Sequence, residues 1–335
     1  MSDDIVQVKQ LCVLAEVGNP FQVPSRFSSA ISTFIAQNKN PASSPNYASV
    51  EADNYGPILK LLSNEKFLQN LDFALSILHV IVLLTRKESN RYKFGSVGFQ
   101  AILPLLKPGS TNSLVLAEVA NIILNVCYEA DNVIEFIHSG GFPSLISCLG
   151  IDDLQVQINA SGAIQSICFQ EEGKSAIQQT NGIQSLASLL SKDDQRLLIR
   201  VTGSLHNISS DPNSVAQIVE CHIVQLLLSF LTSKSDALVI SSIGTLQNMC
   251  CTPEGKAEIK SVDGFEQMLR LCVHPSNEIV SSAVGGVFNL LRSTEGEELE
   301  GRFVGKQWKR LVGLLVTLGA VHSLLFPNKR CSFDE

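Results

Sequence analysis

The chain has 335 residues, of which 45% are hydrophobic and only 17% are charged, so it can bury a large core. This composition excludes an intrinsically disordered chain, a collagen and a coiled coil. Aromatic residues make up only 6%, which favours helices packed through aliphatic side chains over a β-sandwich. The net charge of −7 argues against nucleic acid as a partner.

The amino terminus and the cysteines predict the compartment. The first residues, MSDDIVQVKQ, lack the basic segment and apolar run of a secretory signal. The nine cysteines are scattered and form no C-x-x-C pair, so they suit buried free thiols better than disulfides or a zinc site. We therefore expect a cytoplasmic protein, with a nuclear location left open.

In chain order, the first predicted elements form an amino-terminal cap. The segments IVQVKQLCVLAEV and SRFSSAISTFIAQ are predicted to be helical, and the Pro-, Ser- and Asn-rich residues 38–55 are predicted to be a loop. Residues 1–54 are thus expected to be a helical cap and loop.

An internal repeat dominates the rest of the chain. Five segments share a small residue, apolar residues and then Asn or Gln: LAEVANIILNVC, QINASGAIQSIC, IRVTGSLHNIS, VISSIGTLQNMC and VSSAVGGVFNLL. We call their polar residue the landmark; it falls at Asn125, Gln165, Asn207, Asn248 and Asn289, at intervals of 40, 42, 41 and 41 residues. A constant period of this length indicates a repeat architecture.

Each period contains the pattern of three helices. A polar turn precedes a short first helix, an aliphatic second helix begins at a Gly or its equivalent, and a long third helix carries the landmark. Apolar residues in the third helix recur with helical spacing, as at Leu198, Val201, Leu205 and Ile208. Glycines lie four residues before the last three landmarks, at positions 203, 244 and 285, where Gly costs about 1 kcal/mol relative to Ala, so we expect a close approach of helices there.

The pattern resembles the armadillo repeat, most clearly in GIQSLASLL at 182–190 followed by VTGSLHNI at 201–208. The resemblance implies an all-α, right-handed superhelical solenoid of armadillo repeats with helical caps. The array is expected over residues 55–292, with about six repeats, the first degenerate with Val82 at the landmark. Residues 293–335 are expected to be a carboxy-terminal helical cap and short tail. Gln165 and Val82 depart from the Asn of the family.

Several residues suggest catalysis, nucleotide binding or metal binding, but their spacing does not match the motifs that these functions need. The EEGKSA at 171–176 contains the end of a phosphate-binding loop, but PEGKAE recurs at 253–258, and its Gly lies 82 residues after Gly173. A motif that recurs in register belongs to the repeat itself. The six histidines show no metal-binding spacing. We therefore expect no catalytic site, metal or cofactor.

The armadillo resemblance also implies a binding surface. In that family the third helices line a concave groove, and their Asn side chains bond the backbone of an extended peptide; an amide can donate and accept together. The implied partner-binding residues are Asn121, Asn125, Gln165, Arg200, Asn207, Asn248 and Asn289. In the competing interpretation these amides bond only neighbouring backbone.

The predicted groove is mostly neutral. Import receptors of this family place Trp four residues before Asn, whereas this chain has Asn, Ser or Gly there, and its only Trp, Trp308, lies outside the array. The sequence thus disfavours a nuclear-import receptor and favours peptides of mixed polar and apolar character.

The prediction is a non-catalytic scaffold or adaptor that binds an extended segment of one or more proteins. One alternative is a regulator of a GTPase or chaperone that acts through globular contacts. Another is a membrane-associated scaffold that uses the apolar run 311–326, although its sixteen residues fall short of the roughly 18–20 that span a bilayer. The oligomeric state is left open.

Overall fold

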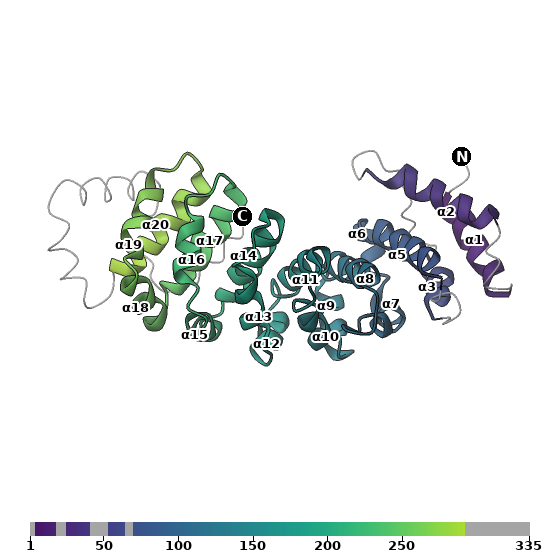
Figure 1. Cartoon of the computed structure of the whole chain (residues 1–335), viewed down its shortest axis with the longest axis horizontal. Helices are drawn as coiled ribbons and strands as arrows, with labels where there is room; N and C mark the ends of the chain where they lie inside the picture. Colours follow the sequence, from purple (N-terminus) through teal and green to yellow (C-terminus); the bar gives the residue numbers. More distant parts are fainter. Residues whose placement is uncertain (1–3, 18–24, 41–52, 64–69, 292–335) are drawn as a thin grey trace. The chain divides into compact units, whose positions relative to one another are not determined.

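The computed structural model describes residues 4–17, 25–40, 53–63 and 70–291, and every regular element in these ranges is helical. The predicted all-α class is confirmed. The chain divides into two compact units, residues 1–204 and 205–335. Figure 1 labels the helices in chain order.

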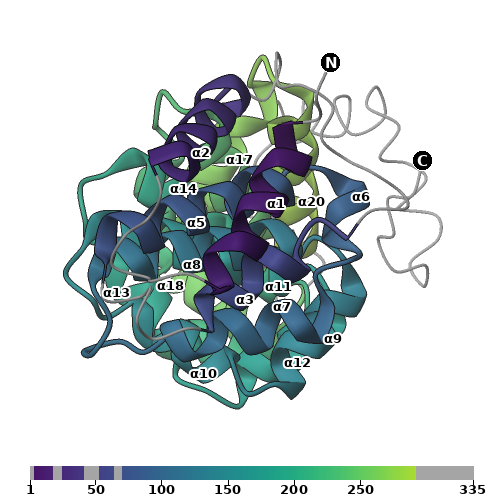
Figure 2. The same cartoon turned by 90° about the vertical axis from the view of Figure 1, so that its right-hand side faces the viewer.

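The first unit begins with α1 (Asp4–Val17) and α2 (Ser25–Asn38), which pack against each other and against α3 (Gly56–Leu62) and α5 (Leu71–Thr85). Figure 2 turns this end of the molecule toward the viewer. The Lys9 ammonium donates to Asn54 Oδ1 at 3.1 Å, and the Asn54 amide donates to Asn90 Oδ1 at 2.9 Å. These two bonds connect α1 to the first repeat.

The remaining helices of the first unit follow the predicted three-helix order. They are α6 (Glu88–Arg91), α7 (Gly95–Ile102) with the 3₁₀ turn η1 (Leu103–Leu105), α8 (Ser113–Val126), α9 (Ala130–His138), α10 (Phe142–Cys148), α11 (Leu154–Ile167), α12 (Glu171–Gln178) and α13 (Gly182–Leu189). The boundary between the units falls within α14 (Gln195–Ser209).

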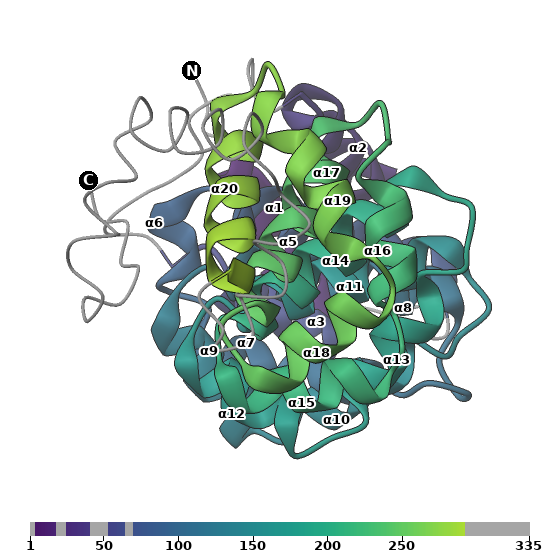
Figure 3. The same cartoon turned by 90° about the vertical axis from the view of Figure 1, so that its left-hand side faces the viewer.

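The second unit continues the same order, and Figure 3 turns it toward the viewer. Its helices are α15 (Pro212–Glu220), α16 (Val224–Phe230), α17 (Asp236–Met249), α18 (Pro253–Ser261), α19 (Gly264–Arg270) with the 3₁₀ turn η2 (Leu271–Val273), and α20 (Asn277–Leu291).

Third helices pack side by side within each unit. Helix α8 packs between α5 and α11, and α17 packs against α20. The residues that gave α14 its apolar period, Leu198, Val201, Leu205 and Ile208, are all buried, as the spacing predicts. Since each helix buries its apolar face against a neighbouring repeat, the core extends along each unit in layers of aliphatic side chains.

The turn between first and second helices has a residue with positive φ in three repeats, whereas the corresponding Asn181 has φ of −82°. Gly140, His222 and Asp263 all have positive φ, of 73°, 53° and 54°. They are 82 and 41 residues apart, so they occupy the same place in their repeats. Glycine adopts this left-handed conformation without steric cost, whereas His222 and Asp263 adopt it at a cost of about 1 kcal/mol or more.

The recurrent Gly-Lys motif closes the turn that follows the third helix. A Cβ atom on Gly173 would lie 2.0 Å from the carbonyl oxygen of Ile167, and one on Gly255 would lie 2.2 Å from that of Met249. The Lys174 side chain is mostly buried, and its ammonium pairs with Glu171 Oε1 at 2.8 Å. The motif therefore serves the close approach of backbone at the same place in two repeats, as its recurrence predicts.

Two predictions concern the end of the chain. The apolar run 311–326 and the predicted cap and tail at 293–335 lie outside the described residues. Among the helices that the structure describes, none has the length and apolarity to cross a membrane. The same residues contain no cluster of three or more His, Cys, Asp or Glu that could hold a metal ion.

Candidate functional site

A stripe of accessible side chains runs along the third helix α8 of the first unit. On α8 it comprises Leu114, Glu118, Asn121 and Asn125, which alternate in spacing between four and three residues and so share one helix face. The opposite face of α8 is buried in the core. The site residues predicted for this helix, Asn121 and Asn125, are one turn apart on the accessible face.

Two landmark amides donate to the preceding third helix. Asn125 Nδ2 donates to Thr85 Oγ1 at 3.1 Å and to Val82 O at 3.4 Å. In the second unit, Asn248 Nδ2 donates to Ser209 Oγ at 3.0 Å and to His206 O at 3.4 Å. A carbonyl oxygen only accepts, so the amide nitrogen must face it. Each Oδ1 is left without a hydrogen bond to the described protein.

The other amides differ in how much of their hydrogen-bonding capacity is used. Asn289 Nδ2 donates to Cys251 Sγ at 3.2 Å. Asn121 is half-buried, and its side chain makes no hydrogen bond to the described residues. Asn207 is half-buried on α14. The amide nitrogens of Asn125 and Asn248 thus join neighbouring third helices, and the carbonyl oxygens of the same two residues stay available.

Gln165 and Arg200 come together in the first unit. Arg200 Nη1 donates to Gln165 Oε1 at 3.3 Å, and both side chains are half-buried. A Cβ atom on Gly203 would lie 2.5 Å from Gln165 Nε2. Gly203 therefore makes room for a side chain of the preceding third helix.

The same packing recurs in the second unit. A Cβ atom on Gly244 would lie 2.5 Å from His206 Nε2, and one on Gly285 would lie 2.5 Å from Gln247 Nε2. The sequence predicted a close approach of helices at these glycines. What approaches them is a polar side chain from the third helix before, which the residue type alone does not show.

His206 and Gln247 are binding candidates that the sequence analysis missed. Burial lowers the pKa of His206, so its imidazole is neutral near pH 7 and has one donor and one acceptor. Each of the two residues directly precedes a landmark Asn, and this position is the signal that could have identified them. Together with Asn248 and Asn289 they form a neutral polar surface.

In the first unit, His79 and Glu118 form a hydrogen-bonded pair on the accessible face of α5 and α8. His79 Nδ1 lies 3.3 Å from Glu118 Oε1, and the hydrogen bond to Glu118 raises the pKa of His79 despite the opposing effect of burial. The second oxygen, Glu118 Oε2, is buried and has no hydrogen-bond partner in the described chain. This face of α8 therefore presents an acidic group.

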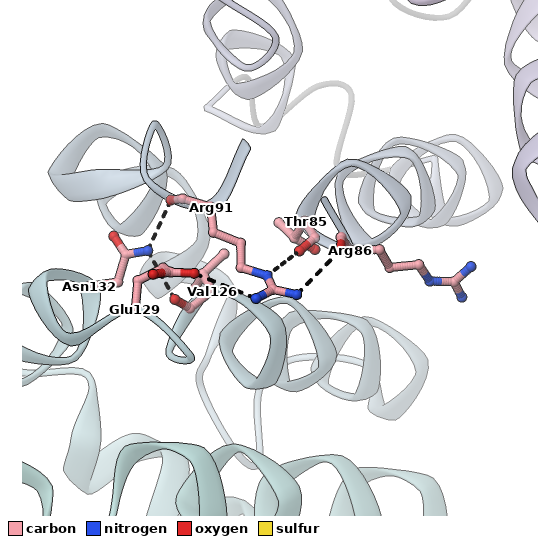
Figure 4. Close-up of polar contacts among 6 residues, drawn as sticks. All are labelled: Thr85, Arg86, Arg91, Val126, Glu129 and Asn132. Atoms are coloured by element: carbon pink, nitrogen blue, oxygen red, sulfur yellow. Dashed lines mark hydrogen bonds and ion pairs between the residues drawn. The ribbon is translucent and has the colours of Figure 1, made fainter. Parts of the chain in front are cut away.

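A second polar network lies where the third helices end, and Figure 4 shows it. Arg91 Nε donates to Thr85 O at 3.1 Å, its Nη2 to Arg86 O at 3.3 Å, and its Nη1 to Glu129 Oε1 at 3.5 Å. Asn132 Nδ2 donates to Val126 O at 2.9 Å and to Arg91 O at 3.0 Å. These side chains satisfy the last carbonyls of α5 and α8.

Comparison with known families identifies the repeat. The family model for the armadillo/beta-catenin-like repeat matches residues 130–169, which cover α9, α10 and α11. The fold is that of armadillo repeats. The comparison with curated proteins returned no match.

Solved armadillo-repeat and engineered proteins share this fold. An engineered protein is 22% identical over 71% of this chain and 97% of its own, with a TM-score of 0.65. A designed armadillo repeat protein in complex with the peptide (KR)4 is 17% identical, covers 70% of this chain and 98% of its own, and has a TM-score of 0.62. A further engineered protein is 18% identical over 99% of this chain and 86% of its own, with a TM-score of 0.66.

Proposed function

We propose that this armadillo-repeat chain is a protein-binding scaffold and that its third helices bind an extended segment of a partner protein. The observation that carries the proposal is the state of the landmark amides. The hydrogens of Asn125 and Asn248 are used within the protein, and their carbonyl oxygens are not. An extended peptide has backbone N–H groups that lack partners, and such oxygens can accept from them.

The internal bonds of these amides favour binding. A flexible amide loses rotamer freedom when it binds a peptide, at roughly 0.5–1.5 kcal/mol for a side chain of this size. Asn125 and Asn248 are already held by two contacts each, so their Oδ1 atoms are oriented before a partner arrives. Asn121, one turn away, adds an amide that can both donate and accept.

The chemistry of the surface indicates the kind of segment. In the second unit the accessible groups include His206, Gln247 and two Asn residues, which are neutral near pH 7. In the first unit Glu118 and Arg200 add one charge of each sign. A segment of mixed polar and apolar residues suits such a surface better than a strongly acidic or basic one. The designed neighbour with a bound peptide supports peptide binding by this fold.

The test uses the full chain and selected peptides. A phage-displayed library of linear peptides of about 12 residues is panned on the protein, and the selected peptides are titrated against variants. Asn121→Ala is expected to weaken binding about 3- to 10-fold, which corresponds to one hydrogen bond. The double variant Asn207→Ala with Asn248→Ala applies the same test to the second unit. Gln184→Ala, an exposed amide on the second helix α13, is the matched control.

Two results would count against the proposal. One is a peptide that binds tightly and equally to the wild type and to all third-helix variants. The other is a loss of affinity in Gln184→Ala alone, which would move binding to the second-helix face and favour globular contacts. Circular dichroism on each variant checks that the fold is retained.

A further inference from the structure

Two exposed aromatic rings occupy the same place in adjacent repeats. Tyr128 follows the end of α8 and is 54% exposed, and Phe169, 41 residues later, follows the end of α11 and is 72% exposed. Helices α8 and α11 pack against each other along their length. The two rings therefore lie at the same edge of the first unit, next to the turns into α9 and α12.

Tyr128 already holds a guanidinium group from its own chain. The Arg91 Cζ atom lies 5.1 Å from the centroid of the Tyr128 ring, within the range of a cation–π contact. Glu129, the next residue after the ring, lies 3.5 Å from the same guanidinium. Figure 4 shows Glu129 and the end of α5 on either side of the Arg91 head group. An aromatic ring and a carboxylate thus bind one arginine at this edge.

Phe169 offers the same type of ring without a cation. The residue 41 positions after Arg91 is Asn132, whose side chain bonds Val126 O and Arg91 O instead. No cation or second ring in the described part of the chain contacts Phe169. A phenylalanine left this exposed gains free energy if another molecule covers it.

Exposed carboxylates lie in the first turns of the two first helices at this edge. Glu172 lies in the first turn of α12, three residues after Phe169, and Asp131 lies in the first turn of α9, which packs against α12. Both are exposed and make no hydrogen bond or ion pair with the described residues. Glu171 is also exposed, but Lys174 neutralises it at 2.8 Å. The edge is therefore aromatic and net acidic, which is complementary to an arginine side chain.

We propose that Phe169, with the carboxylates of Glu172 and Asp131, binds an arginine side chain of a partner protein, as Tyr128 and Glu129 bind Arg91. The planar guanidinium stacks on a ring better than a lysine ammonium does, so arginine is the preferred residue. This inference rests on the proposed function only in that the partner is a protein. The surface involved is the edge of the unit, distinct from the landmark amides.

The test measures binding of defined peptides to the full chain. The probe is a fluorescein-labelled Gly-Arg repeat of about eight residues, and matched Gly-Lys and Gly-citrulline peptides differ only in the side chain. Fluorescence anisotropy is recorded at about 0.15 M salt to limit long-range attraction. Phe169→Ala is expected to weaken Gly-Arg binding about 2- to 5-fold, whereas Phe169→Tyr keeps the affinity within about 2-fold. Glu172→Gln combined with Asp131→Asn is expected to weaken it as well.

Controls separate this surface from non-specific attraction and from the amides. Val273→Ala removes a side chain that is 65% exposed in the second unit, and it is expected to leave the affinity unchanged. The citrulline peptide, which is neutral, is expected not to bind. Because Phe169 is largely exposed, Phe169→Ala is expected to retain the far-UV circular dichroism of the wild type.

Four outcomes would overturn the inference. They are no binding of the Gly-Arg peptide to the wild type, equal binding by wild type and Phe169→Ala, an equal loss in Val273→Ala, and equal affinity for the citrulline peptide. If binding depends on Asn121 but not on Phe169, the third-helix proposal stands and this one falls. If it depends on Phe169 but not on Asn121, this inference stands independently of the landmark amides.

Discussion

Replacing Gly173 with Ala tests the close backbone approach that follows a third helix. The added Cβ would lie 2.0 Å from Ile167 O, whereas Cβ atoms stay at least 3.0 Å from such atoms, so the start of α12 must move by about 1 Å. Overpacking of this kind costs typically 1–3 kcal/mol, and the better helix propensity of Ala returns about 0.5–1 kcal/mol. Because the obstacle is a backbone oxygen, we expect a net loss of about 1–2 kcal/mol.

The assay is thermal and urea unfolding followed by circular dichroism. A loss of that size lowers the melting temperature by about 3–6 °C for a unit of this length. Gly150→Ala is the control, because its Cβ would meet only Ser147 O, at an ordinary 3.6 Å. Gly255→Ala, at 2.2 Å from Met249 O, repeats the test in the second unit. Equal melting temperatures for Gly173→Ala and Gly150→Ala would refute the reasoning.

Three further predictions concern single side chains. Arg91→Ala should lower the unfolding free energy by about 2–3 kcal/mol, because it removes a charged donor to two carbonyl oxygens. The control Arg86→Ala, which removes an exposed contact, should lower it by under about 0.5 kcal/mol. Similar losses for the two variants in urea titrations would contradict this prediction. Because the pKa of His79 is raised in the folded state, its protonation stabilises the fold fully below about pH 6.5, and this contribution is lost as pH rises through the folded-state pKa. In the Glu118→Gln variant, an NMR titration should show a lower His79 pKa. The unfolding free energy of that variant should also depend less on pH. His222→Gly should stabilise the second unit by up to about 1 kcal/mol, because His222 has a φ of 53° and glycine adopts this left-handed conformation without steric cost. A lower melting temperature than that of the wild type would contradict this, since it would mean that contacts of the His222 side chain stabilise the fold by more than the backbone strain costs.

The repeat period and helix order could be predicted because they depend on residue spacing alone. The interval of about 41 residues located the third helices, and the apolar residues of α14 proved to be buried where the helical period placed them. The recurrence of Gly173 at Gly255 also predicted a role in the repeat itself, and both glycines lie close to a backbone carbonyl of the preceding third helix.

The state of each polar group could not be predicted in the same way. The sequence shows that Asn125 and Asn248 are amides, but which of their atoms remain available depends on Thr85 and Ser209, about 40 residues earlier. Likewise, Gly244 signalled a close approach, but only the packed structure shows that the His206 imidazole makes it. Contacts between repeats decide both questions, and one sequence gives no measure of them.

The hydrogen bonds of the landmark amides run in one direction along the chain, from a later repeat to an earlier one. Asn125 donates to Thr85 Oγ1 and Val82 O, and Asn248 donates to Ser209 Oγ and His206 O, so in both cases a later repeat donates hydrogen bonds to an earlier one. A chain cut after a third helix leaves behind acceptors that its missing successor would have served. A chain cut before a third helix instead leaves unpaired N–H donors on an Asn side chain, and water binds these donors more easily than it binds acceptors at the end of a helix. Truncation from the carboxy terminus should therefore harm the remaining repeats more than truncation from the amino terminus.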